Sequence, residues 1–428
     1  MHTRARSNEW ILSSPRKALL RRTEKVLLGC ASALLAACGG GQSQQMSATS
    51  LGDVSNPVVA TEHGGAAAAA ECGAGTLTEA GSQALDRLPY LQRISESGAS
   101  VLFTTIAADQ TPPLLELRRP SGELVATAEA VEDPAASNGQ QRLASWNDLE
   151  PNSTYCYSIA GWTAPTGLRT APRTGSDQAV RFVVFGDSGS DSDGQRSVHD
   201  QLSQVPFDLI LHTGDVAYEA GSLAALERTF FDVYANYLRN APVFPTTGNH
   251  DYRTDSGEPF RQVFALPDNG GPDGNERWYS FNFGAVHFVA LDTEWELPQQ
   301  TEWLARDLGA NHLPWTIAYL HRPPFSSGEH GSNLAVRSAF TPLFERYGVQ
   351  LVFAGHDHDY ERTVPINGVT YVVTGGGGRG TRPVGSSSFT AFSEDALHFV
   401  AVSIEGTVLL LHAIGATGRQ LDSLQLSL

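Results

Sequence analysis

Five apolar segments of this chain each run directly into a polar side chain that can bind a metal ion. The segments are VRFVVFG, LILHTG, VFPTTG, IAYL and LVFAG, and they end at Asp187, Asp215, Asn249, His321 and His356. Short apolar runs of this kind predict buried strands. Helical patterns alternate with them at residues 195–204, 223–240, 299–309 and 334–347. The alternation predicts an α/β domain whose sheets are buried by helices.

The placement of these polar residues predicts a site at one edge of the sheets. In α/β domains, functional residues gather beyond the carboxyl ends of the strands. A single Asp or His there is often only a cap or turn residue. Together with His358 the set has six members and no cysteine, which favours a two-metal site with oxygen and nitrogen ligands.

The strings that follow the strands resemble a known family. GDSG at 186–189, GDVAY at 214–218, GNHD at 248–251, the isolated His321 and GHDHDYER at 355–362 resemble, in this order, the five motif blocks of the purple acid phosphatases. These enzymes belong to the binuclear metallophosphoesterase superfamily. The similarity covers about residues 180–415 and implies a catalytic domain at 178–428, folded as a four-layer α/β/β/α sandwich.

The resemblance also implies which residues hold the two ions. Asp187, Tyr218 and His358 would bind one ion, Asn249, His321 and His356 the other, and Asp215 would bridge the two. The segment His356–Asp357–His358 suits this arrangement. Alternate side chains along an extended chain face the same way, so each ion can take one imidazole while Asp357 points away.

One departure from the superfamily pattern concerns Tyr218. Most relatives begin with Asp-x-His, whereas here Asp187 is followed by Ser188 and Gly189, so that ligand is missing. Tyr218 stands three residues after Asp215, where its phenolate could fill the vacancy. A phenolate is a hard, anionic donor, so we expect iron(III) in this position and a divalent zinc, iron or manganese ion beside it. The ordinary alternative is a packed tyrosine near two divalent ions.

The reaction implied by the resemblance is hydrolysis of phosphate monoesters by a metal-bound hydroxide. Two histidines outside the ligand set are candidate catalytic residues. We assign His250 to contact with a phosphoryl oxygen and His330 to protonation of the leaving group. The alternative for His330, in the sequence FSSGEHGSN, is a solvated loop residue.

Other functions remain open at this stage. A phosphodiesterase or nucleotidase would use the same metal core, because the motifs leave the substrate pocket undefined. A cell-surface adhesion module with an inert phosphoesterase domain predicts broken ligand positions. All seven positions are filled here, which favours an enzyme.

Residues 85–172 carry short strand-like runs separated by turn signals at roughly ten-residue spacing, which is typical of a small all-β sandwich. The stretch that ends at Tyr155, LEPNSTY, resembles the tyrosine corner of fibronectin-type-III-like domains. Many purple acid phosphatases carry a similar domain before the catalytic one. We therefore expect a fibronectin-type-III-like domain here.

The first 37 residues resemble a bacterial lipoprotein signal. A basic stretch runs into VLLGCASALLAA, which is too short to span a bilayer comfortably, and LAAC at 35–38 resembles a lipobox. We expect Cys38 to be lipidated and to anchor the protein at the cell envelope. The alternative is an ordinary cleavage site and a periplasmic or secreted protein.

Residues 38–84 are rich in Gly, Ala, Ser and Thr, and we expect a flexible linker. Once Cys30 leaves with the signal and Cys38 carries lipid, Cys72 and Cys156 remain. In an oxidising compartment they could form a disulfide or stay as two buried thiols.

The net charge of −17 bears on partners. Residues 38–428 hold 22 Arg, no Lys and 44 Asp or Glu, so a protein that coats nucleic acid is excluded as a general class. The expected partner is a phosphorylated small molecule or a phosphoprotein, with the membrane contacted only through Cys38. The sequence leaves the oligomeric state open.

Overall fold

The computed structural model describes residues 64–136, 139–271 and 276–428. These residues lie in one compact unit. The expected signal and Cys38 fall outside the described residues. Within the described ranges, no helix is long and apolar enough to cross a membrane.

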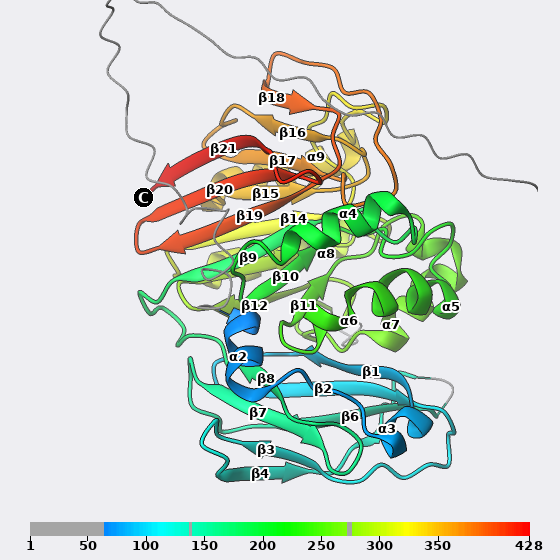
Figure 1. Cartoon of the computed structure of the whole chain (residues 1–428). Helices are drawn as coiled ribbons and strands as arrows, with labels where there is room; N and C mark the ends of the chain where they lie inside the picture. Colours follow the sequence, from blue (N-terminus) through cyan, green and yellow to red (C-terminus); the bar gives the residue numbers. More distant parts are fainter. Residues whose placement is uncertain (1–63, 137–138, 272–275) are drawn as a thin grey trace, which may run out of the picture. The chain divides into compact units, whose positions relative to one another are not determined.

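The first part of this unit is a small all-β sandwich of two antiparallel sheets (Figure 1). One sheet has the order β1 (Leu85–Gln92), β2 (Ala99–Thr105), β6 (Gln141–Trp146) and β5 (Val131–Glu132). The other has the order β4 (Leu124–Ala128), β3 (Leu115–Arg118), β7 (Thr154–Ile159) and β8 (Thr166–Arg169). The buried Tyr155 hydroxyl accepts the Glu150 backbone N–H at 2.9 Å, which is the contact of a tyrosine corner.

The expected linker is wrong for residues 64–84, which are folded. Helices α2 (Gly64–Cys72) and α3 (Glu79–Ala84) precede β1, and Thr78 caps α3 by accepting the Gly81 N–H at 3.0 Å. The run Ala66–Ala70 has strong helix propensity and small side chains. The small side chains let α2 pack closely on β8, where a Cβ atom at Gly167 would overlap the backbone of Ala68. A low-complexity composition concealed a helix that is stabilised by tertiary packing.

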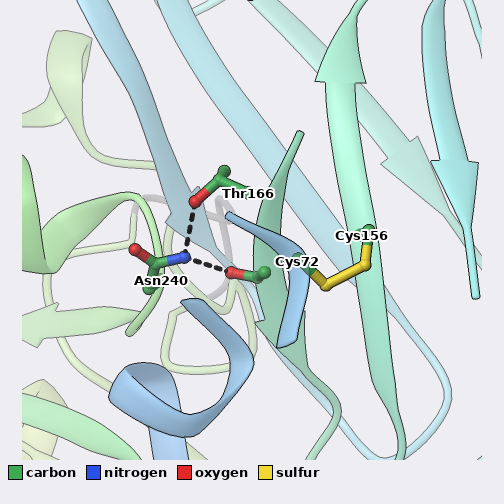
Figure 2. Close-up of a disulfide and its surroundings, with 5 residues drawn as sticks. Cys72, Cys156, Thr166 and Asn240 are labelled. Atoms are coloured by element: carbon green, nitrogen blue, oxygen red, sulfur yellow. Dashed lines mark hydrogen bonds between the residues drawn. A yellow bond between two sulfur atoms is a disulfide. The ribbon is translucent and has the colours of Figure 1, made fainter. Parts of the chain in front are cut away.

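A disulfide joins Cys72, the last residue of α2, to Cys156 in β7 (Figure 2). Of the two alternatives left open by the sequence, a disulfide or two buried thiols, the structure therefore has the disulfide. Beside it, the Asn240 amide donates to Thr166 Oγ1 at 2.8 Å and to the Gly167 carbonyl at 2.6 Å. These bonds connect the sandwich to the α/β part.

The α/β part contains two mixed sheets. The first has the order β11 (Val243–Pro245), β10 (Leu209–His212), β9 (Val180–Phe185), β19 (His398–Glu405), β20 (Val408–Gly415) and β21 (Gln420–Ser427). The second has the order β12 (Tyr279–Phe283), β13 (Val286–Ala290), β14 (Trp315–Leu320), β15 (Leu351–Ala354), β17 (Thr370–Thr374), β16 (Tyr360–Thr363) and β18 (Thr390–Glu394). Neighbours in β9–β11 and in β13–β15 are parallel.

Alternating side chains give each sheet one face toward the other sheet and one toward helices. From β9, Phe182 packs edge-on against Phe288 of β13 with ring centroids 5.2 Å apart. Phe185, three residues on, lies on the opposite face and contacts Tyr234 of helix α6. The period of two along the strands thus produces a buried sheet-on-sheet layer.

Helices cover both outer faces (Figure 1). The first side carries α4 (Asp193–Leu202), α5 (Leu223–Leu226), a π-helical turn (Glu227–Phe231), α6 (Asp232–Leu238) and α7 (Glu258–Val263), with 3-10 turns at Asp251–Arg253 and Asp255–Gly257. The second carries α8 (Leu297–Ala310) and α9 (Leu334–Tyr347). Trp303, Phe340 and Phe344 from α8 and α9 pack in one cluster with the outward side chains of β13–β15. The four-layer α/β/β/α architecture predicted from the sequence is confirmed.

Candidate metal centre

The strand register brings the predicted site residues to one edge. Phe185 pairs with His212, and His212 pairs with Pro245, so β9, β10 and β11 end at the same level. In the second sheet Leu320 pairs with Ala354, and the Gly355 N–H donates to the His321 carbonyl at 3.0 Å. The loops after all five strands therefore start side by side.

Three of the predicted ligands converge on the hydroxyl of a fourth, Tyr218. The hydroxyl donates to Asp215 Oδ2 at 2.7 Å and to Asp187 Oδ1 at 3.0 Å, and it lies 3.2 Å from His358 Nε2. His358 Nε2 is also 3.5 Å from Asp187 Oδ1. All four side chains are buried. This set matches the first ion's predicted ligands together with the predicted bridge.

The other three predicted ligands lie on the far side of Asp215. His321 Nε2 is 3.1 Å from Asn249 Oδ1 and 3.6 Å from Asp215 Oδ2. The His321 and His356 rings are in edge contact, with centroids 5.0 Å apart. Asp215 thus lies between the two groups. We refer to the seven residues as the candidate metal centre.

Backbone geometry explains how the side chains come so close. Asp187, Asp215 and His356 adopt left-handed φ angles of 57°, 53° and 71°, which are uncommon for residues other than glycine. Glycines make room for the carboxylates. A Cβ atom at Gly355 would overlap Oδ2 of Asp187, and one at Gly248 would overlap Oδ1 of Asp215. Both glycines belong to the sequence motifs. The site requires them because any larger residue would collide with the carboxylates.

The electrostatics of the centre favour a cation. Burial, and then the charges of Asp187 and Asp215, raise the pKa of Tyr218 well above its ordinary value, so the phenol keeps its proton between two carboxylates. Burial, followed by His321 and Arg322, lowers the pKa of His356 and keeps its imidazole neutral, as a metal ligand must be. Asp187, Asp215 and His321 each offer a ligand atom within 4.8 Å of the others. The donor set fits hard or borderline metal ions.

Two further groups hold the ligands in place, and we did not single them out from the sequence. The buried carboxylate of Asp251 accepts the backbone N–H groups of Gly248 at 2.8 Å and Val216 at 3.1 Å, and so joins the loops after β10 and β11. Burial and the charge of Asp215 raise the pKa of Asp251 to about 7. The Thr213 carbonyl lies 2.9 Å from His321 Nδ1, which orients the ring. The GNHD motif contains Asp251 and was the available signal.

The two candidate catalytic histidines flank the centre. The His250 ring packs on Tyr218 with centroids 4.3 Å apart, and its Nδ1 is 2.8 Å from the Glu219 carbonyl. The His330 ring is exposed and stacks on His356 at 4.3 Å. From the sequence alone, His330 could also be a solvated loop residue. In the fold its exposed ring stacks on His356, a predicted metal ligand.

Three arginines at the centre were missed by the sequence analysis. Arg322 Nη1 lies 3.2 Å from His356 Nε2, Arg379 lies over the Tyr218 ring, and Arg382 bonds the His330 imidazole. Their positions depend on loop conformations that no motif specifies. Arg362, by contrast, forms an ion pair with Asp422 at 2.6 Å.

Comparison with known proteins supports the same domain. Residues 180–360 match the family model described as calcineurin-like phosphoesterase. The chain is 30% identical to acid phosphatase type 7 of Mus musculus over 51% of this chain and 56% of that protein. It is 26% identical to Fe(3+)-Zn(2+) purple acid phosphatase 12 of Arabidopsis thaliana over 54% of each chain.

A solved structure shares the fold. The purple acid phosphatase from yellow lupin (Lupinus luteus) seeds superposes with a TM-score of 0.69 over 80% of this chain and 75% of that one, at 20% identity. The chain spans only about half to three fifths of the length of the curated relatives it matches. Residues 180–360 therefore contain a calcineurin-like metallophosphoesterase domain, and the chain has purple acid phosphatases among its homologues.

Proposed function

We propose that this protein is a purple acid phosphatase-like phosphomonoesterase with a binuclear metal centre. The observation that carries the proposal is the convergence of six other donors around Asp215, with the Tyr218 hydroxyl within hydrogen-bond distance of Asp187, Asp215 and His358. A catalytically inert fold has no need to bury two carboxylates, a phenol hydroxyl and an imidazole against one another. The relatives named as acid phosphatases support the same reaction class.

The metals we propose are iron(III) and a divalent ion. Asp187, Tyr218 and His358 would hold iron(III), Asn249, His321 and His356 the divalent ion, and Asp215 would contact both. One relative carries Fe(3+)-Zn(2+) in its name, which supports this pairing. When bound, the ions would supply Lewis-acid activation of water and neutralise charge on the phosphoryl group.

The chain's own residues would position the substrate and move one proton. We assign the His250 imidazole to a phosphoryl oxygen, because its ring packs on Tyr218 at the exposed side of the centre. We assign His330 to protonation of the leaving alkoxide, because it is exposed yet stacked on His356. An alkoxide is a poor leaving group, so this proton transfer matters most for alkyl esters.

A phosphodiesterase or nucleotidase is the second candidate, because the same ligands serve both reactions. The deciding experiment compares kcat/KM for 4-nitrophenyl phosphate and bis(4-nitrophenyl) phosphate at matched metal content. A higher value for the monoester supports the proposal, and a higher value for the diester overturns it. An Asp215→Asn variant should lose activity on both, whereas an adhesion module would hydrolyse neither substrate.

We also propose that the protein is exported and anchored through lipid on Cys38. The basic stretch, the short apolar run and LAAC at 35–38 support this. A Cys38→Ser variant should move from the membrane fraction to the soluble fraction and keep its specific activity. Membrane association that persists in the variant would contradict a single lipid anchor.

A further inference from the structure

Two arginines in residues 379–382, which we call the arginine loop, are fixed to the backbone of the candidate metal centre. The Arg379 N–H donates to the carbonyl of Asp187 at 2.9 Å, and the Arg382 N–H donates to the carbonyl of His358 at 3.0 Å. Both acceptors belong to residues predicted to hold the same ion. The backbone therefore places two guanidinium groups beside that ion's site.

The guanidinium groups lie next to a predicted metal ligand and next to the proposed proton donor. The Arg379 Cζ atom is 5.1 Å from the Tyr218 ring centroid. Arg382 bonds the imidazole of His330, our candidate for leaving-group protonation. An ester whose leaving group contacts His330 would therefore lie close to Arg382.

Each arginine has a glutamate partner that is more exposed than the arginine itself. Arg379 is 37% exposed and pairs with Glu219, which is 67% exposed. Arg382 is 29% exposed, and its Nε lies 3.9 Å from Glu329, which is 59% exposed. Ion pairs this open to water contribute little to folding stability. An incoming anion can replace either glutamate without leaving a buried charge uncompensated.

The acidic net charge of the chain affects how an anionic substrate would approach these two arginines. The chain is strongly acidic, so an anionic substrate is repelled by most of its surface. Positive charge held at the centre would offset that repulsion locally. A guanidinium binds a carboxylate or phosphate through paired N–H donors.

We propose that Arg379 and Arg382 form a subsite for a second anionic group of the substrate, a carboxylate or phosphate adjacent to the phosphoryl group that is hydrolysed. The subsite rests on the proposed phosphatase function, because it names the substrate class of that same site. It predicts selectivity for phosphate esters that carry an additional oxyanion over esters with neutral leaving groups.

The test measures binding of matched phosphonates to the metal-loaded protein by isothermal titration calorimetry. 2-Carboxyethylphosphonate and propylphosphonate differ by a carboxylate in place of a methyl group, and ethane-1,2-bisphosphonate supplies a second phosphonate instead. We expect the carboxylate compound to bind about tenfold more tightly than propylphosphonate, the scale of one charge-assisted contact. The bisphosphonate arm shows whether phosphate or carboxylate is preferred.

Variants attribute the preference to the arginines. Arg379→Gln should reduce the affinity ratio about fivefold, and Arg379→Gln with Arg382→Gln should bring it close to one. Glu219→Gln removes the competing carboxylate and should raise the ratio. Arg119→Gln is the matched control, because Arg119 is also 37% exposed, pairs with an exposed glutamate, and lies in the β-sandwich.

The outcomes separate the two proposals. Equal binding of the two phosphonates by the wild type, or an unchanged ratio in the double variant, overturns the subsite. Failure to hydrolyse 4-nitrophenyl phosphate overturns the phosphatase proposal alone, because the affinity ratio is measured without turnover. Metal chelation by the second anionic group would persist in the arginine variants, so it cannot produce the expected loss.

Discussion

Asp357 holds the backbone of His330 in place. Its Oδ1 accepts the His330 N–H at 2.8 Å, and its Oδ2 accepts the Ser326 hydroxyl at 2.5 Å. Asp357 lies between His356 and His358 in sequence but faces the loop that precedes α9, away from both imidazoles' ligand positions. Residues 356–359 form a bend, in which His356 has a left-handed φ of 71°. This bend presents His356 and His358 as predicted ligands, while Asp357 between them supports the backbone of a catalytic candidate.

This relationship predicts a selective defect in Asp357→Ala. We expect kcat for glycerol 2-phosphate to fall about tenfold, with a smaller loss for 4-nitrophenyl phosphate, because only the alkyl leaving group needs a proton. Asp357→Asn keeps one acceptor oxygen and should restore most of the activity. Adding Asp357→Ala to His330→Ala should cost nothing further on the alkyl ester. Additive losses would show that Asp357 acts independently of His330.

His330→Ala tests the proton donor itself. We expect a loss of about 10²-fold in kcat for glycerol 2-phosphate, the usual scale for a single general acid, and a much smaller loss for 4-nitrophenyl phosphate. Steady-state kinetics on both esters at equal metal content gives the comparison. A loss of the same size on both substrates would assign His330 to binding or folding instead.

Tyr218→Phe tests the iron(III) ligand. A phenolate bound to iron(III) gives a visible charge-transfer band, so the wild type should be coloured and the variant should lose the band. The fold should persist, because only one oxygen is removed from a packed ring. Visible absorption at matched iron content, without reductant, is the measurement. An active wild type that contains no iron and has no colour would refute iron(III) but leave a two-metal phosphoesterase intact.

His398 predicts a loss of stability in acid. It is fully buried between the Ala396 carbonyl at 2.9 Å and the Thr374 hydroxyl at 3.1 Å, and burial lowers the pKa of its imidazole to about 4. The unfolded chain, with an ordinary pKa near 6.5, binds a proton first as pH falls. Stability contributed by neutral His398 is present above about pH 6.5 and lost progressively toward pH 4.

At pH 5 this loss amounts to about 2 kcal/mol of unfolding free energy relative to pH 7. Urea unfolding of the wild type and of His398→Gln at both pH values measures it. The variant should be less stable at pH 7 but should lose less stability on acidification. Parallel losses in both proteins would remove His398 as the source.

The Cys72–Cys156 disulfide predicts that the purified mature protein has no titratable thiol from these residues until it is reduced. The bridge spans 84 residues, and a closed loop of that length stabilises the folded state by about 4.6 kcal/mol in the chain-entropy model. Cys72→Ser with Cys156→Ser should therefore unfold at lower urea concentration. Two free thiols in denatured, unreduced wild type would contradict the pairing.

The site could be predicted because each of its ligands is marked by a short, local sequence pattern. Each ligand follows its own strand within a few residues, and parallel strands end at one edge, so Asp187, Asp215 and His321 could be placed together from their sequence positions. The glycines beside them were visible in the motifs. Their role becomes clear only in the structure, where a side chain at Gly355 or Gly248 would collide with a carboxylate of the centre.

The features that could not be predicted depend on contacts between segments that are far apart in the sequence. Arg379 and Arg382 reach the centre because their backbone N–H groups bond to residues 187 and 358, a contact that no periodicity encodes. Helix α2 was concealed because an alanine-rich stretch resembles a linker until Gly167 offers it a surface. Asp357 was assigned a direction but not a partner, since the loop of His330 had no predicted conformation.

The bond at Cys72 also determines how the molecule bears mechanical load. Under the proposed lipid anchor, tension on the leader would enter at the start of α2, and a sufficient force would unwind that helix from its first residue. Unwinding can proceed only as far as Cys72, where the disulfide transfers the force to β7. Strand β7 is hydrogen-bonded to β3 on one side and to β8 on the other, so the force is distributed over a whole sheet. The load therefore does not rest on the packing of the nine-residue helix α2 alone.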